Sequence, residues 1–228
     1  MTTKTIAQAD AVWDAIDDQR ARTADLLEQL TDEQWEHPSL CEGWTVRHVA
    51  AHLTLQQQRL GDFAAFTARH PRMLRSLTLN ATIHDSALIQ ARVLSSQEII
   101  ARIRGMIGSR KHNVLVTPLE TLTDILVHSQ DMAIPLGLDL AMRPASAALA
   151  ATRRWDTRSS WLDTVFHRIP LGGYRLAATD TDWTRGAGLE VEGPIAAILL
   201  LLTGRSVALD RLTGAGVDAL RPVHSTSS

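Results

Sequence analysis

Asp124 and His128 have the residue types and the spacing that a metal site requires. They lie four positions apart in the segment "TDILVHSQDM", so a helix would place the carboxylate and the imidazole above the same turn, with Asp131 on the same polar stripe. Such a pair supplies half of a metal site. A histidine from a neighbouring helix would complete a two-histidine, one-carboxylate set with open coordination positions, which is typical of catalytic rather than structural sites. Alternatively, the three residues form a solvated helix face.

The segment "CEGWTVRHVAAHL", residues 41–53, contains two histidines that face different surroundings. Helical projection places His52 at the edge of an apolar stripe, from which it can turn inward, and places His48 nearly opposite, towards solvent. The stripe consists of Val46, Val49, Leu53 and Leu60. Taken alone, the position of His52 favours a hydrogen-bonded residue at the boundary of the core over a metal ligand.

Four helices are predicted to position these residues within the first 140 residues. They cover about residues 12–30, then 46–66 after a cap at Thr45, then 96–108 after a cap at Ser95 or Ser96, and finally 118–134. The last has the clearest start, because Thr117 is followed by Pro118 at the first helical position and Glu120 at the third. Four helices joined in this way indicate a bundle.

After about residue 140 the pattern changes. Residues 143–155 and 159–170 still have helical patterns, but residues 172–183 and 188–193 show the alternation of two strands joined by a polar turn. Asp180 and Asp182 are interpreted as residues of that turn. An apolar helix over residues 194–205 follows. The prediction is an α+β protein with a metal-binding four-helix bundle over residues 1–140 and a small α+β domain over residues 141–228.

Composition restricts the partners and the compartment. The formal net charge of −2, with 23 basic and 25 acidic residues, provides no field that would attract nucleic acid or anionic lipid. The single cysteine, Cys41, excludes an intramolecular disulfide and is interpreted as a packing residue rather than a nucleophile. The longest apolar run, residues 195–202, is far shorter than the roughly 20 residues that span a bilayer. The N-terminus lacks signal-peptide features, so we expect a cytoplasmic protein without membrane partners.

Three segments resemble the mycothiol-dependent maleylpyruvate isomerase family, within the DinB-like metal-binding superfamily. They are "LTDEQWEHPSLCEGWTVRHVAAHL", "DILVHSQDMAIPLG" and "YRLAATDTDWTRGAGLEVEGPIAAILLLLTGRSVALDRLTGAGV", so the likeness covers nearly the whole chain. The resemblance implies a DinB-like four-helix bundle at the N-terminus that binds a divalent metal, usually zinc.

The same resemblance implies the roles of the candidate ligands. By position, His52 and His128 bind the metal, and Asp124 takes the place of a glutamate. Aspartate is one methylene shorter, so the helix must lie closer to the metal or bind it more weakly. Asp131 matches a position that is commonly acidic, where it would orient an imidazole or serve as a reserve ligand. His48 matches no metal position and is expected at the surface.

The family uses a low-molecular-weight thiol such as mycothiol, so the resemblance implies a thiol as cosubstrate. An open position on zinc would deprotonate the sulfur, and the thiolate is the nucleophile. The expected activity is that of an isomerase or a thiol S-transferase that acts on a small electrophilic substrate such as maleylpyruvate. By position, Arg205 of "LLTGR" would grip a substrate carboxylate, although an arginine at a helix end also suits the helix dipole.

An alternative is a DinB-like protein that binds a metal or a ligand without turnover, in a stress or regulatory role. The replacement of glutamate by Asp124 favours this alternative. Retention of both histidines and of the "TGR" segment favours an enzyme. No sequence feature indicates an oligomeric state.

Overall fold

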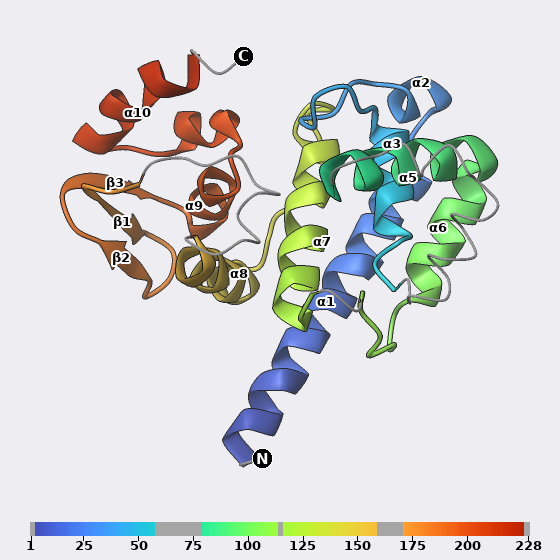
Figure 1. Ribbon diagram of the computed structural model, residues 1–228, viewed down its shortest axis with the longest axis horizontal. Coiled ribbons are helices and arrows are strands. Elements are labelled where there is room, and N and C mark those ends of the chain that lie inside the picture. Colours follow the sequence, from blue (N-terminus) through green and yellow to red (C-terminus); the bar gives the residue numbers. More distant parts are fainter. Residues whose placement is uncertain (1–2, 58–78, 114–115, 159–170, 226–228) are drawn as a thin grey trace. The chain divides into compact units, whose positions relative to one another are not determined.

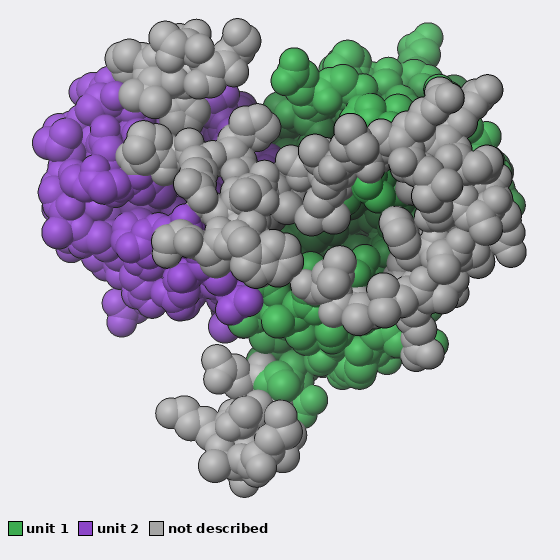
Figure 2. Space-filling model, in the orientation of Figure 1, with its two compact units in different colours: residues 1–141 green, residues 142–228 purple. Residues whose placement is uncertain are grey.

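The computed structural model describes residues 3–57, 79–113, 116–158 and 171–225. The chain divides into two compact units, Met1–Ala141 and Met142–Ser228 (Figure 2). Helices make up the first unit, and the second combines helices with a three-stranded sheet (Figure 1). This is the α+β class that the sequence predicts. Within the described ranges, no helix combines the length and the apolar character needed to cross a membrane.

The helices of the first unit pack around one apolar core. They are α1 (Thr3–Glu28), α2 (Asp32–Trp35), α3 (Val46–Leu53), α5 (Leu79–Val93), α6 (Ser96–Gly105) and α7 (Pro118–Ala133). α1 packs against α6 and α7, and α3 packs against α5 and α7 (Figure 1). Trp35, Val49, Leu53, Ile99 and Ile125 are core residues with at most 2% of their surface exposed. Apolar packing therefore holds α3, which carries His52, against the helix that carries the other predicted ligands.

Capping boxes fix where the helices of the site begin. Thr45 lies at the N-cap of α3 and Thr117 at the N-cap of α7, as the sequence predicts. In α7, the backbone N–H of Thr117 donates to the Glu120 carboxylate at 2.8 Å, which closes one side of the box. Ser95 rather than Ser96 caps α6. The starts of these helices are thus set by local side chains.

Two features of this unit differ from the prediction. α3 ends at Leu53 and continues as turns up to residue 57, and the rest of the predicted helix lies outside the described residues. α5 was not predicted. Its buried face is formed by small and polar side chains, so its sequence lacks the apolar stripe that predicts a helix. The buried residues are Ser86, Ala87, Gln90 and Ala91.

The second unit packs helices on a small mixed sheet. Its elements are α8 (Pro144–Thr157), β1 (Tyr174–Ala178), β2 (Thr184–Gly186), β3 (Leu189–Gly193), α9 (Ile195–Leu202), the 3-10 helix η3 (Ser206–Arg211) and α10 (Ala215–Ser225). α9 packs against α8, β1 and β3, which explains its uniformly apolar sequence. α10 was not predicted, and the helix predicted over residues 159–170 lies outside the described residues.

The sheet corrects the predicted pair of strands. The strand order is β2-β1-β3, with β1 antiparallel to β2 and parallel to β3. β2 was missed because three residues are too few to show alternation. The chain passes round the start of β1 at Gly188, where an added Cβ would lie 1.9 Å from the carbonyl oxygen of Gly173. Asp180, in the β1–β2 turn as predicted, also accepts the backbone N–H of Ile195 at 2.8 Å and so caps α9.

Candidate metal centre

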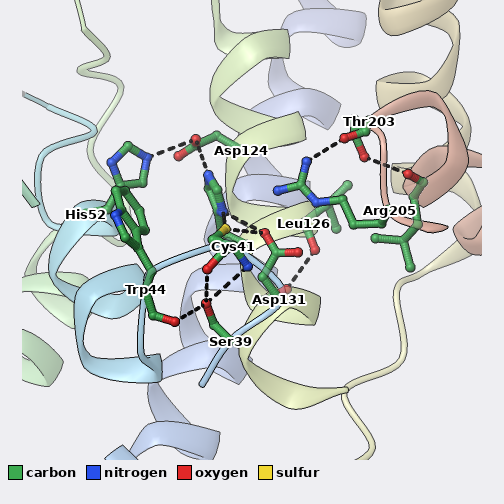
Figure 3. A network of polar contacts seen from close by, with 12 residues as sticks. Ser39, Cys41, Trp44, His52, Asp124, Leu126, Asp131, Thr203 and Arg205 are labelled. Atoms are coloured by element: carbon green, nitrogen blue, oxygen red, sulfur yellow. Dashed lines mark hydrogen bonds and ion pairs between the residues drawn. The ribbon is translucent and has the colours of Figure 1, made fainter. Parts of the chain in front are cut away.

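α3 and α7 bring the predicted ligands to one point. His52 lies in the last turn of α3 and its imidazole faces Asp124 of α7 (Figure 3). Its Nε2 atom is 3.3 Å from Oδ1 of Asp124, and the Nε2 atom of His128 is 3.4 Å from the same oxygen. The ligand atoms of the three residues all lie within 4.8 Å of one another. The three residues therefore form a compact group of two imidazoles and one carboxylate.

The distances within this group suit a small divalent cation. Zinc binds nitrogen and oxygen at about 2.0–2.2 Å, so two donors of a tetrahedral site lie about 3.3–3.6 Å apart. Both nitrogen–oxygen separations to Asp124, 3.3 and 3.4 Å, fall in this range. The side chains of both histidines are 16% exposed and that of Asp124 is 29% exposed, so the group is partly open to solvent. Three protein donors would leave a fourth position for another ligand.

Asp131 orients the imidazole of His128. Its Oδ2 atom lies 2.8 Å from Nδ1 of His128, and the residue has no exposed surface. An ionised carboxylate only accepts hydrogen bonds, so Nδ1 carries a proton towards Asp131 and Nε2 is the ring nitrogen that faces Asp124. This arrangement supports the predicted orienting role of Asp131. Nε2 is the atom of His128 that is free to bind a metal beside His52.

Sequence reasoning missed the residues that hold the second oxygen of Asp124. Oδ2 accepts a hydrogen bond from Nε2 of Gln56 at 2.7 Å. The carbonyl oxygen of the Gln56 side chain in turn accepts a hydrogen bond from Arg20 of α1 at 3.2 Å. Gln56 lies four positions after His52, and this spacing is the one feature of the sequence that could have placed Gln56 near the site. The contact with Arg20 depends on the packing of distant segments.

Cys41 has polar contacts that its interpretation as a packing residue did not include. It does pack against the apolar core, but its thiol also donates to Oδ2 of Asp131 at 3.2 Å and lies 3.6 Å from Nδ1 of His128. The backbone N–H of Leu40 donates to the carbonyl oxygen of Asp131 at 3.0 Å, which ties this loop to α7. Cys41, His128 and Asp131 thus form a second group of potential metal donors that shares one histidine with the first.

The charges of the site shift the pKa values of two of its groups. Burial raises the pKa of Asp124, but the facing imidazoles of His52 and His128 lower it by more, so the pKa lies well below its usual value. Burial lowers the pKa of His128, whereas the nearby Cys41, Asp124 and Asp131 raise it, and its pKa lies well above the usual value. Without a metal, the site therefore holds a carboxylate against a protonated imidazole.

His48 has a structural role that the prediction of a surface residue missed. It occupies the third position of α3, where its Nδ1 accepts the backbone N–H of Thr45 at 3.0 Å and completes the capping box. Burial lowers its pKa, partly offset by the charge of Glu36, so the neutral ring needed for this contact is favoured. The residue is partly buried and is absent from both donor groups.

Arg205 belongs to the second unit. It follows α9 at the N-cap of η3, and its Nη1 donates to the carbonyl oxygen of Thr203 at 2.6 Å (Figure 3). Thr203 is the C-cap of α9, so this contact agrees with an arginine that stabilises a helix end. Its grip on a substrate carboxylate stays a prediction.

The fold and the donor group define a helical domain with a candidate two-histidine, one-carboxylate centre, followed by a small α+β unit. Residues 16–124 match the family described as the mycothiol maleylpyruvate isomerase N-terminal domain, which supports the family resemblance found in the sequence. The matched residues include His52 and end at Asp124, so His128 lies just beyond them. No curated protein matches the sequence.

Two solved structures share the fold. A crystal structure of the mycothiol-dependent maleylpyruvate isomerase aligns with a TM-score of 0.59 at 15% identity and covers 95% of this chain and 96% of that one. A histidine-to-alanine mutant of the mycothiol-dependent maleylpyruvate isomerase aligns with a TM-score of 0.57 at 14% identity, with the same coverage. At this identity the likeness concerns the fold, and it confirms the α+β class with a helical N-terminal domain.

Proposed function

We propose that this protein is a divalent-metal-dependent enzyme that uses a low-molecular-weight thiol of the mycothiol type. The reaction is isomerisation or thiol transfer on a small electrophilic substrate such as maleylpyruvate. The observation that carries the proposal is the convergence of two imidazole nitrogens on one oxygen of Asp124, at 3.3 and 3.4 Å. The match of residues 16–124 to the mycothiol maleylpyruvate isomerase N-terminal domain family supports the choice of thiol.

Each residue of the centre has a defined task in this proposal. His52, Asp124 and His128 hold the metal, which is zinc in the simplest case because imidazole and carboxylate suit it. When bound, zinc supplies a Lewis acid that lowers the pKa of a thiol. Asp131 keeps the proton on Nδ1 of His128. Arg205 is retained as the residue that grips a substrate carboxylate, on the family resemblance alone.

A protein that binds metal or ligand without turnover is the alternative function. One feature of the sequence favours it: Asp124 stands where the family resemblance implies a glutamate. The distances from Asp124 to both histidines nevertheless fit a metal site, so the shorter side chain does not by itself favour loss of the metal. Cytoplasmic location stays a prediction from the sequence.

Metal analysis followed by a thiol assay tests the proposal. We expect purified protein to bind one zinc per site, and His52→Ala to lower zinc affinity by at least about tenfold, since one of three donors is lost. The zinc-loaded wild type should then bind mycothiol and isomerise maleylpyruvate or transfer the thiol to an electrophile. A protein that holds zinc but neither binds the thiol nor turns over would support the non-catalytic alternative. If the wild type binds no zinc, or if His52→Ala binds zinc as tightly as the wild type, both the proposed metal site and the proposed enzymatic function are wrong.

A further inference from the structure

The two oxygens of Asp124 have different partners. Oδ1 faces Nε2 of His52 at 3.3 Å and Nε2 of His128 at 3.4 Å. Oδ2 accepts a hydrogen bond from Nε2 of Gln56 at 2.7 Å, a short bond of the kind that charged acceptors make. One oxygen of the carboxylate therefore faces the two histidines of the candidate metal centre, and the other is held by Gln56.

Arg20 fixes the orientation of the Gln56 amide. A guanidinium only donates hydrogen bonds, so the carbonyl oxygen of Gln56 must face Arg20 and the amide N–H must face Asp124. Arg20 has no exposed surface and Gln56 is 8% exposed, so the hydrogen bond between these two side chains is shielded from water. In a buried site such hydrogen bonds are stronger than at the surface.

Arg20 is itself held from the other side. Its Nη1 donates to the carbonyl oxygen of Met106 at 3.0 Å and lies 3.5 Å from Oδ1 of Asp17. These contacts prevent the guanidinium from swinging away from Gln56. Burial lowers the pKa of Arg20, and the charges of Asp17 and Asp124 partly offset this effect. An arginine remains charged under such conditions, so the donor towards Gln56 is permanent.

We propose that Gln56, held by Arg20, is a positioning residue that restricts Asp124 to one metal-binding oxygen. This inference rests on the proposed function and adds to it what keeps the thiol position free. A carboxylate that binds a metal through both oxygens occupies two coordination positions, whereas one that binds through a single oxygen occupies one. Because Gln56 retains Oδ2, two imidazoles and one oxygen leave a position for the sulfur of the cosubstrate.

Cobalt substitution provides the test, because the visible absorption of Co²⁺ weakens as its coordination number rises. In Gln56→Met, which keeps the chain length but removes the amide donor, and in Gln56→Ala, we expect weaker absorption than in the wild type. Mycothiol should then perturb the cobalt spectrum only at about tenfold higher concentration, the usual size of effects from residues that orient a ligand. Affinity for cobalt itself, measured by chelator competition, should change less than thiol affinity does.

Gln57→Ala is the matched control. Gln57 is the next residue, its amide nitrogen is buried, and it has no hydrogen-bond partner for that nitrogen among the described residues. Its loss should leave both the cobalt spectrum and thiol binding unchanged. If folded Gln56→Met and Gln56→Ala proteins show the wild-type spectrum and thiol affinity, this inference is wrong while the proposed function stands. A wild type that binds no cobalt would instead overturn the proposed function.

Discussion

The Nδ1 atom of His128 lies 2.8 Å from Oδ2 of Asp131, a carboxylate with no exposed surface. Removal of the negative charge should weaken the imidazole as a ligand. We expect Asp131→Asn to lower zinc affinity by about tenfold and Asp131→Ala by up to about a hundredfold, with zinc still bound at high concentration. Competition with a chromogenic chelator measures both.

Asp131 would be the ligand, rather than the orienting residue, if Asp131→Asn lost zinc completely while Asp124→Asn kept wild-type affinity. The structure argues for the opposite outcome, because Asp124 Oδ1 faces both imidazole Nε2 atoms.

Zinc binding should become weaker as the pH falls. The pKa of His128 lies well above its usual value in the metal-free protein, so zinc must displace a proton near neutral pH. Affinity should rise with pH until the pH passes this raised pKa and then level off. Calorimetric titration in buffers of different ionisation enthalpy counts the released protons. Binding without proton release at neutral pH would mean that His128 is already neutral.

The same shift makes the stability of the metal-free protein depend on pH. A raised pKa in the folded state stabilises the fold fully below the unfolded-state pKa, and this contribution is lost as pH rises through the folded-state value. The unfolding free energy of the wild type, compared with that of His128→Gln, should therefore show its largest excess near about pH 6 and a smaller one near about pH 9. Urea unfolding at both pH values provides the comparison. An excess that grows with pH would contradict the direction of the shift.

Substitution of Cys41 shows which of the two groups of potential donors binds the metal. The thiol donates to Asp131 at 3.2 Å, so Cys41→Ala should lower the free energy of unfolding by about 1 kcal/mol, and Cys41→Ser, which keeps a donor, should lower it less. Chemical denaturation measures the loss. Zinc stoichiometry should be unchanged in both variants. Loss of zinc in Cys41→Ala would instead identify Cys41, His128 and Asp131 as the group that binds the metal.

The capping box at the start of α7 should show coupling between its two members. We expect Thr117→Ala to reduce the free energy of unfolding by about 1 kcal/mol, because backbone donors of the first turn lose their acceptor. Glu120→Ala should lower the free energy of unfolding less in the Thr117→Ala protein than in the wild type, because the contact between the Thr117 hydroxyl and the Glu120 carboxylate is already lost there. A double-mutant cycle under thermal or urea unfolding tests this, and strictly additive losses would show that the box is not cooperative.

The features that could be predicted from the sequence are those encoded locally. Thr45 and Thr117 are N-cap residues that mark the starts of their helices within four residues of sequence. The spacing of Asp124 and His128 alone places both on one face of a helix. That His52 meets them was implied by the family resemblance, since α3 and α7 are distant in sequence. The contact from Arg20 to Gln56 joins positions 36 residues apart and has no local pattern. α5 and β2 were missed because neither shows an apolar period.

Three of the four charged or imidazole groups at the centre, Asp124, His128 and Asp131, belong to one helix within eight residues. Their spacing along α7 therefore already places the three side chains near one another. Of the three proposed metal ligands only His52 lies on another helix, so the geometry of the centre depends on how α3 lies against α7. A slide or rotation between these two helices would separate His52 from the other donors and leave the arrangement within α7 intact.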